Sequence, residues 1–131
     1  MDAVAQQQLS QAADALAQQQ GDRQISWAEM NRRANGVAQA LLDTPNVAEQ
    51  DKIAHYLYNC PEYLESTFAA FKAGFATVNT NYRYAADELV YLWDNADATA
   101  VVFHGTFTEQ CDAVRDRDRH GRRRTTCGFK G

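Results

Sequence analysis

The sequence has few of the features that identify membrane, secreted or metal-binding proteins. Its apolar runs fall short of the roughly 18 residues that cross a bilayer, and its first residues lack the basic and apolar segments of a signal peptide. It contains 3 cysteines, an odd number, and no Cys-x-x-Cys pair. We therefore expect a cytoplasmic protein with reduced thiols, no disulfide framework and no transmembrane segment.

Glycine-rich phosphate-binding motifs are also missing. Neither Gly-x-Gly-x-x-Gly nor Gly-x-x-x-x-Gly-Lys-Ser/Thr occurs, so no dinucleotide-binding or Walker-type loop can be recognised. This absence makes a free-standing small nucleotide-binding domain the weakest of the functions considered below.

The residues that are present are typical of a globular domain followed by a tail of different composition. Of the 131 residues, 45% are hydrophobic and 23% are charged, which argues against intrinsic disorder of the whole chain. Residues 1–114 carry 15 acidic and 6 basic side chains, whereas residues 115–131 carry 2 and 7. We predict an N-terminal helix over 1–22, a folded body over 23–114 and a basic, disordered tail over 115–131.

Two helices are predicted in the first third of the chain. Residues 3–20 are rich in Ala and Gln, which favour an opening helix before a turn at Gly21. Ser26 and Glu29 have the spacing of a capping box, so a second helix should begin there and end near Pro45. Its apolar positions form one stripe of Trp27, Met30, Ala34, Val37, Ala38 and Leu41.

From residue 52 onward, strand and helix patterns alternate. Strands are predicted at 53–58, 75–79 and 99–103, a helix from Pro61 to Gly74, and another helix with Asp87 and Glu88 in its first turn. We expect the helix cores to be Leu64, Phe68 and Phe71 in the first, and Leu89, Leu92, Trp93 and Ala96 in the second. The order strand, helix, strand, helix, strand predicts an α/β fold with a partial, doubly wound parallel sheet flanked by helices.

Possible reactive sets are explained better by structure than by chemistry. His104, Cys111, His120 and Cys127 match no usual zinc-ligand spacing, so we predict no metal site. A nucleophilic Cys60 would need His55 as its base, and no third residue would orient that pair.

The charged groups likewise have structural explanations. Glu62 and Glu65, like Asp87 and Glu88, fall in the first turn of a predicted helix, where carboxylates complement the helix dipole. The Arg-rich tail lacks the interleaved aromatics of nucleic-acid-binding segments, so we expect no nucleic-acid partner. These patterns predict no catalytic residue.

A resemblance to a known family adds to this interpretation. The ordered blocks that carry it are Ile25-Ser-Trp-Ala-Glu-Met-Asn-Arg-Arg-Ala-Asn, Asp51-Lys-Ile-Ala-His-Tyr-Leu-Tyr-Asn-Cys-Pro-Glu-Tyr-Leu, Ala69-Ala-Phe-Lys-Ala-Gly-Phe and Asn81-Tyr-Arg-Tyr-Ala-Ala-Asp-Glu-Leu. In order and spacing they resemble the N-terminal region of AMP-forming acyl-CoA synthetases. The segment Asn-Tyr-Arg-Tyr is most similar to the bacterial fatty-acid-CoA ligases.

The resemblance implies a lineage of enzymes that use ATP, Mg²⁺ and CoA to convert a fatty acid to acyl-CoA, AMP and pyrophosphate. The family's ATP-binding loop, metal-binding glutamate segment and C-terminal lysine lie beyond the matched region, so the chain alone is expected to be inactive and to hold no cofactor. Near Arg115 the sequence departs from the family pattern, which we interpret as a truncated or frameshifted gene.

One cofactor contact is implied for this chain. In some CoA-using members the arginine of the Asn-x-Arg segment lies near a CoA phosphate, and Arg83 is the matching residue. The alternative is that Arg83 only solvates a bend or pairs with Asp87. A non-enzymatic alternative also stays open for the whole chain, namely a binding or pseudo-enzyme module that associates with another chain carrying the missing domains.

Overall fold

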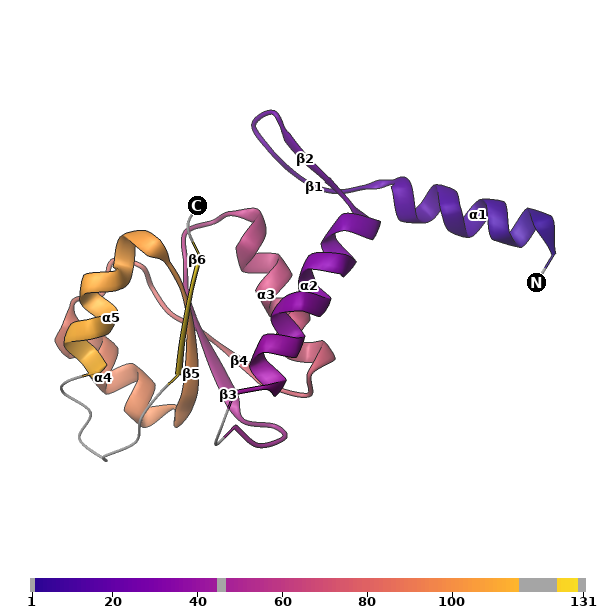
Figure 1. Ribbon diagram of the computed structural model, residues 1–131. Coiled ribbons are helices and arrows are strands. Elements are labelled where there is room, and N and C mark those ends of the chain that lie inside the picture. Colours follow the sequence, from indigo (N-terminus) through magenta and orange to yellow (C-terminus); the bar gives the residue numbers. More distant parts are fainter. Residues whose placement is uncertain (1, 45–46, 116–124, 130–131) are drawn as a thin grey trace.

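The fold is an α/β sandwich built on one parallel sheet. The computed structural model describes residues 2–44, 47–115 and 125–129 (Figure 1). The sheet has the order β4-β3-β5-β6, with all its neighbouring strands parallel. Its strands are β3 (Lys52–Tyr56), β4 (Ala76–Asn79), β5 (Ala98–His104) and β6 (Thr125–Phe129). The predicted α/β class and parallel sheet are confirmed.

Helices cover both faces of this sheet. In Figure 1, α2 and α3 lie against one face, and α4 and α5 against the other. The bounds are α2 (Trp27–Leu42), α3 (Pro61–Lys72), α4 (Ala86–Asn95) and α5 (Thr108–Arg115), with a short 3-10 turn η1 (Gly105–Phe107) before α5. The crossover through α3 leads to one side of β3 and the crossover through α4 leads to the other, as in a doubly wound sheet.

The central strands are buried on both faces, as their near-continuous apolar sequence predicts. Ile53 of β3 and Val102 of β5 belong to the core beneath α2 and α3. Tyr56 and Val101 belong to the core beneath α4 and α5. Side chains that alternate between two covered faces are expected of interior parallel strands.

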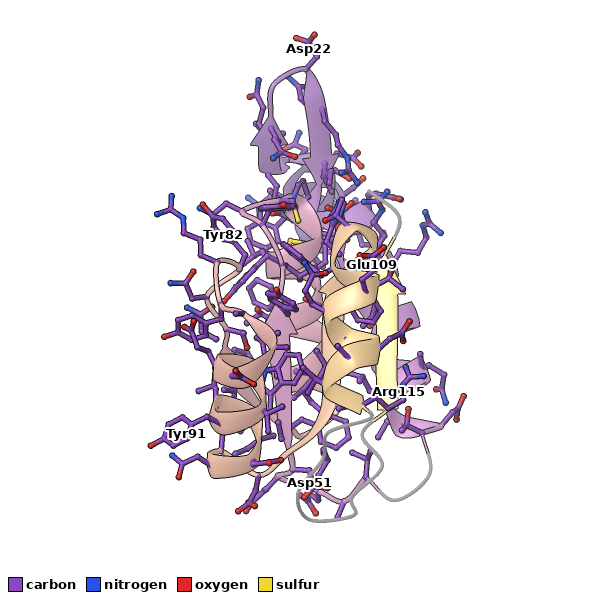
Figure 2. All side chains as sticks on the ribbon, turned by 90° about the vertical axis from the view of Figure 1, so that its left-hand side faces the viewer. Asp22, Asp51, Tyr82, Tyr91, Glu109 and Arg115 are labelled. Carbon is purple, nitrogen blue, oxygen red and sulfur yellow. The ribbon has the colours of Figure 1, made fainter. Side chains whose placement is uncertain are left out.

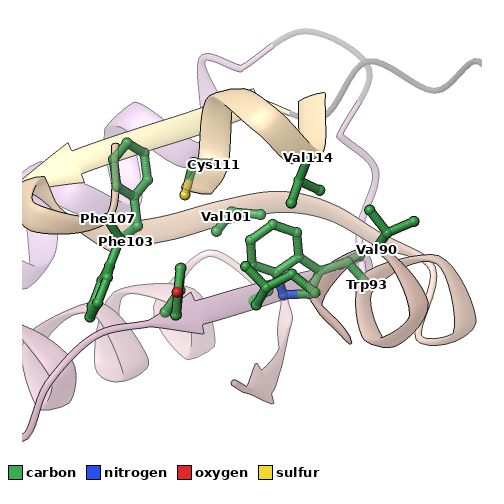
Figure 3. Packing of buried hydrophobic residues seen from close by; sticks show 11 residues of the cluster. Val90, Trp93, Val101, Phe103, Phe107, Cys111 and Val114 are labelled. Atoms are coloured by element: carbon green, nitrogen blue, oxygen red, sulfur yellow. The ribbon is translucent and has the colours of Figure 1, made fainter. Parts of the chain in front are cut away.

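The core beneath α4 and α5 is the larger of the two (Figure 3). Trp93 of α4 is 1% exposed, and Cys111 and Val114 of α5 close the cluster over Val101. Burial raises the pKa of Cys111 to about 12, so its thiol is a packing group. Of the predicted helix core, Leu89 and Trp93 are fully buried, whereas Leu92 and Ala96 are only half-buried.

Helix α2 begins at the predicted cap. The Oγ of Ser26 accepts a hydrogen bond from the backbone N–H of Glu29 at 3.1 Å, and the carboxylate of Glu29 accepts hydrogen bonds from Arg32 and Arg33. The predicted stripe is buried at Met30, Ala34, Ala38 and Leu41. Trp27, at the first helical position, is 47% exposed and lies outside that core.

The helix predicted over 3–20 is shorter than expected. Helix α1 (Ala3–Asp14) has no buried residue, and the chain then forms an antiparallel hairpin of β1 (Leu16–Gln20) and β2 (Arg23–Ser26). Side chains of the hairpin bind the β3–α3 connection and the first turn of α3, through Gln20 Nε2 to Asn59 O at 3.0 Å and Arg23 Nη2 to Glu62 at 2.8 Å. These tertiary contacts override a helix propensity that could not bury an apolar face.

Helix α3 packs by a different face from the one predicted. Leu64, Phe68 and Phe71 are 40%, 38% and 58% exposed. Its buried face consists of Pro61, Glu65, Ser66, Ala69 and Ala70. Small residues let α3 approach the sheet and α2 closely, and they leave the large apolar stripe on the outer side. The predicted helix end is confirmed, since Gly74 has a φ of +84°.

The predicted disorder of the basic tail is not seen at Thr125–Phe129. These residues form β6, which pairs with Ala100–His104 of β5. Three of the five, two Thr and a Phe, are of types that favour strands, and an open edge of the sheet receives them. Residues 116–124 and 130–131 lie outside the described residues. No helix in the described ranges is long and apolar enough to span a membrane.

Candidate binding site at the carboxyl end of the sheet

The loops that follow β3, β4 and β5 meet at one edge of the sheet. In Figure 2, Tyr82 of the β4–α4 loop lies toward the hairpin tip Asp22, and Asp51, which precedes β3, lies at the opposite end of the molecule. The edge near Tyr82 is therefore the carboxyl end. The order β4-β3-β5 places the topological switch point there, where open α/β sheets bind their ligands.

Aromatic rings from these three loops form one cluster. The ring of Tyr58 lies 5.0 Å from that of Tyr82, 4.8 Å from that of Phe107 and 5.6 Å from that of His104, measured between centroids. Tyr58 and Tyr82 are 40% and 39% exposed, so part of each ring faces solvent. The cluster gives this edge a stacking surface for a planar or apolar group.

Arg83, the residue that the family resemblance implied, lies in the same region. Its backbone N–H donates to the side-chain oxygen of Asn81 at 3.0 Å, and its guanidinium carbon lies 5.5 Å from the centroid of the Tyr82 ring. Its side chain is exposed. A guanidinium held over an aromatic ring in solvent can still offer its N–H groups to an anion. The alternative pairing with Asp87 stays a prediction, as does the CoA contact.

A pocket of about 420 Å³ lies at this edge and is lined by both sequence neighbours of Arg83, though not by Arg83 itself. Its lining is dominated by amides and phenols and contains no charged side chain: Leu57, Asn59, Tyr63, Asn79, Thr80, Asn81, Tyr82, Tyr84 and Leu92. Amides and hydroxyls can both donate and accept hydrogen bonds. The pocket is therefore suited to a neutral polar or aromatic group, and the adjacent guanidinium to a negatively charged one.

The pair of His55 and Cys60 is not arranged as a base and a nucleophile. His55 is 1% exposed and packs against Tyr63 of α3, with 5.7 Å between ring centroids, and burial lowers its pKa. Burial raises the pKa of the Cys60 thiol, which is the opposite of what an activated cysteine needs.

The other groups considered in the sequence as possible reactive sets are the carboxylate pairs and the zinc set. Glu62 pairs with Arg23, and the buried Glu65 pairs with Arg33 at 2.9 Å. Asp87 and Glu88 lie in the first turn of α4, as predicted. In the described residues no group of three or more His, Cys, Asp or Glu could hold a metal ion. His120 and the side chain of Cys127 lie outside the description, so the full zinc set stays untested.

The pocket and the aromatic cluster were not predicted from the sequence, and the role of Arg83 stays a prediction. Their residues are scattered over three loops and belong to no motif. One indication was available, because parallel strands place their following residues at a common edge, and Tyr58, Tyr82 and His104 each follow or end a predicted strand.

Comparison with known proteins places the chain among larger enzymes. Residues 5–128 match the family described as AMP-binding enzyme, a match that continues past Arg115, where the family pattern was predicted to end. The medium/long-chain-fatty-acid–CoA/3-oxocholest-4-en-26-oate–CoA ligase of Mycobacterium marinum is 34% identical over 90 residues. That alignment covers 69% of this chain and 16% of the relative, so the chain spans about a sixth of its length.

Solved structures show the same fold. ATP-bound MatB from Rhodopseudomonas palustris is 24% identical, with a TM-score of 0.76 over 88% of this chain and 22% of the other. The anthranilate CoA ligase AuaEII in complex with anthranoyl-AMP is 19% identical, with a TM-score of 0.82 over 96% and 24%. At these identities the likeness concerns the fold alone. It confirms that the chain folds like part of these two proteins.

Proposed function

Because this chain belongs to the AMP-binding enzyme family, we propose that it forms the N-terminal part of a ligase that joins a fatty acid to CoA at the expense of ATP. The observation that carries this proposal is the match over residues 5–128, together with a relative named as a fatty-acid–CoA ligase. The pocket and Arg83 at the carboxyl edge of the sheet supply a binding region of suitable chemistry. The compartment we propose is the cytoplasm.

The described residues fit the binding of CoA but not the adenylation of a fatty acid by ATP. The sequence has no phosphate-binding loop for ATP, and in the described ranges no carboxylate cluster could hold Mg²⁺. We therefore derive no adenylation step on this chain and propose that it is inactive alone. CoA is different, because its phosphates are anions and Arg83 presents an exposed guanidinium beside a neutral polar pocket.

The proposed contact is between Arg83 and a phosphate of CoA. Planar guanidinium groups bind phosphate oxygens through two parallel N–H donors, and the Tyr82 ring beneath the side chain limits the orientations it can take. A charge-assisted hydrogen bond of this kind contributes about 1.5–3 kcal/mol, which corresponds to a roughly tenfold or larger change in affinity.

Calorimetric titration of the 131-residue chain with CoA tests this contact. Arg83→Ala should weaken CoA binding about tenfold, whereas pantetheine, which lacks phosphate, should bind both forms equally. Arg32→Ala is the matched control, because it removes an equal charge from a side chain 73% exposed on α2. Equal CoA affinity of wild type and Arg83→Ala, or no CoA binding at all, would refute the contact.

The proposed inactivity has its own test. ATP–pyrophosphate exchange measured on the purified chain should show no dependence on added fatty acid. Fatty-acid-dependent exchange would show that the chain carries adenylating groups of its own.

The outer face of α3 favours the second candidate function, a module that associates with a chain carrying the rest of the fold. Leu64, Phe68 and Phe71 lie at helical spacing on that face, so α3 presents a large apolar stripe to the outside in addition to the face that it buries against the sheet and α2. Co-purification with a ligase lacking its matched N-terminal segment should be lost in Phe68→Ser/Phe71→Ser. It should persist in Tyr91→Ser, which changes an aromatic residue 72% exposed on α4.

A further inference from the structure

The loop that carries Arg83 is fixed to the core at its beginning. Thr80 is 2% exposed, and its backbone N–H donates to the carbonyl oxygen of His55 at 3.1 Å. Its Oγ accepts a hydrogen bond from the indole Nε1 of Trp93 at 3.0 Å, between groups that are both buried. Strand β3 and helix α4 therefore hold the same residue, three positions before Arg83.

One further contact anchors the loop beyond Thr80, and two hydrogen bonds within the loop close it. The phenol of Tyr56, which is 1% exposed in the core, donates to the carbonyl oxygen of Tyr84 at 3.4 Å. Between these anchors, Asn81 accepts two hydrogen bonds. Its side-chain oxygen accepts one from the backbone N–H of Arg83, and its backbone carbonyl accepts one from the backbone N–H of Tyr84 at 3.1 Å. Arg83 thus lies between two anchored residues in a closed turn.

A separate contact ties the end of β4 to the other helical layer. The hydroxyl of Tyr63, on α3, donates to the side-chain oxygen of Asn79. Tyr63 and Asn79 also line the pocket, whereas Trp93 and Tyr56 do not. Because Trp93 and Tyr56 are buried and do not line the pocket, we expect them to affect a ligand through the loop that they hold.

We propose that the hydrogen bond from Trp93 to Thr80, supported by that from Tyr56 to Tyr84, positions Arg83 for phosphate. This inference rests on the proposed contact between Arg83 and CoA. An arginine on a mobile loop loses much conformational freedom when it binds, and a loop already held in the bound arrangement avoids part of that cost. Thr80, Trp93 and Tyr56 are positioning residues, since they act through Arg83.

The experiment compares two substitutions of Thr80 in two backgrounds. Thr80→Val removes the acceptor for Trp93 with little change in volume, and Thr80→Ser keeps it. Calorimetry should show that Thr80→Val weakens CoA binding about threefold to tenfold. Thr80→Ser, which keeps the hydroxyl, should leave the CoA affinity within about twofold of that of the wild type. Thr80→Val should cause no further loss once Arg83→Ala is present.

The outcomes distinguish the positioning role of Thr80 from the proposed contact between Arg83 and CoA. If Arg83→Ala weakens CoA binding and Thr80→Val does not, positioning is refuted and the Arg83 contact stands. Equal weakening by Thr80→Val with and without Arg83 also refutes positioning, because Thr80 would then act through the pocket it lines. If Arg83→Ala has no effect, the contact itself is refuted. Should Thr80→Val not fold, Tyr56→Phe, which removes the second anchor's hydroxyl, takes its place with the same expected direction.

Discussion

The guanidinium of Arg33 in α2 lies 2.9 Å from the carboxylate of Glu65 in α3, and this ion pair connects the two helices. The Glu65 side chain is 6% exposed and that of Arg33 is 34% exposed. Hydrogen bonding to Glu65 raises the pKa of Arg33. A buried carboxylate with a single cationic neighbour depends on that neighbour for compensation of its lost hydration.

Removal of Arg33 should therefore destabilise the protein. We expect Arg33→Met to lower the free energy of unfolding by about 2–4 kcal/mol, since it leaves the Glu65 charge buried and uncompensated. Arg32→Met is the matched control, because Arg32 is exposed and pairs with the partly exposed Glu29, and it should cost less than about 1 kcal/mol. Urea unfolding measures both, and equal losses would contradict the interhelical role of Arg33.

Replacing Gly74 and Gly36 by alanine should change the free energy of unfolding in opposite directions. Gly74 has a φ of +84°, so Gly74→Ala strains the backbone and should lower the free energy of unfolding by about 1 kcal/mol or more. Gly36 lies within α2 with no neighbouring atom within 4 Å of an added methyl group. Gly36→Ala should raise stability by roughly 0.5–1 kcal/mol. Thermal unfolding of the two variants compares them directly, and a stabilised Gly74→Ala would exclude strain at the end of α3.

The stability of the protein should fall in mild acid because of His55. Burial lowers the pKa of His55 below its ordinary value of 6.5, and its Nε2 has no hydrogen-bond partner in the described structure. Below about pH 6.5 the unfolded state binds a proton that the folded state does not, so the free energy of unfolding decreases as the pH falls.

Unfolding of wild type and His55→Leu between pH 8 and pH 5 measures this effect. As the pH falls, the free energy of unfolding should decrease more in the wild type than in His55→Leu. The difference between the two proteins at pH 8 gives the effect of the substitution on packing alone. A difference that does not vary with pH would mean that His55 is not the group responsible.

The outer face of α3 should contribute little to the stability of this chain alone. Phe71 is 58% exposed, so Phe71→Ala should change the free energy of unfolding by about 0.5 kcal/mol or less. Leu89 has no exposed surface, and Leu89→Ala should cost about 2–4 kcal/mol. A large loss in Phe71→Ala would show that this face is already covered in solution.

The sequence predicted the fold wherever periodicity and neighbouring strands agree. The alternation from β3 to β5 could be predicted because buried parallel strands are continuously apolar and the helices between them carry their own start and stop residues, such as Pro61 and Gly74. Sequence analysis assigned the wrong face of α3 because it ranks large apolar residues as buried. In the structure the close approach of the sheet and α2 selects Ala69 and Ala70 instead.

The hairpin and the site depend on contacts that no local pattern contains. Gln20 is in a strand because its side chain reaches Asn59, 39 positions away. The pocket exists because β3 and β4 end side by side, and its amides and phenols have no required spacing along the chain. The proposal for Arg83 comes from a family segment rather than from a physical pattern, and it stays a prediction.

The anchors of the β4–α4 loop come from both helical layers. Tyr63 of α3 bonds Asn79, the last residue of β4, on one side of the sheet, and Trp93 of α4 bonds Thr80, the first residue of the loop, on the other. Two consecutive residues of the chain are therefore held by helices from opposite layers, so a relative shift of the two layers would strain at least one of these hydrogen bonds.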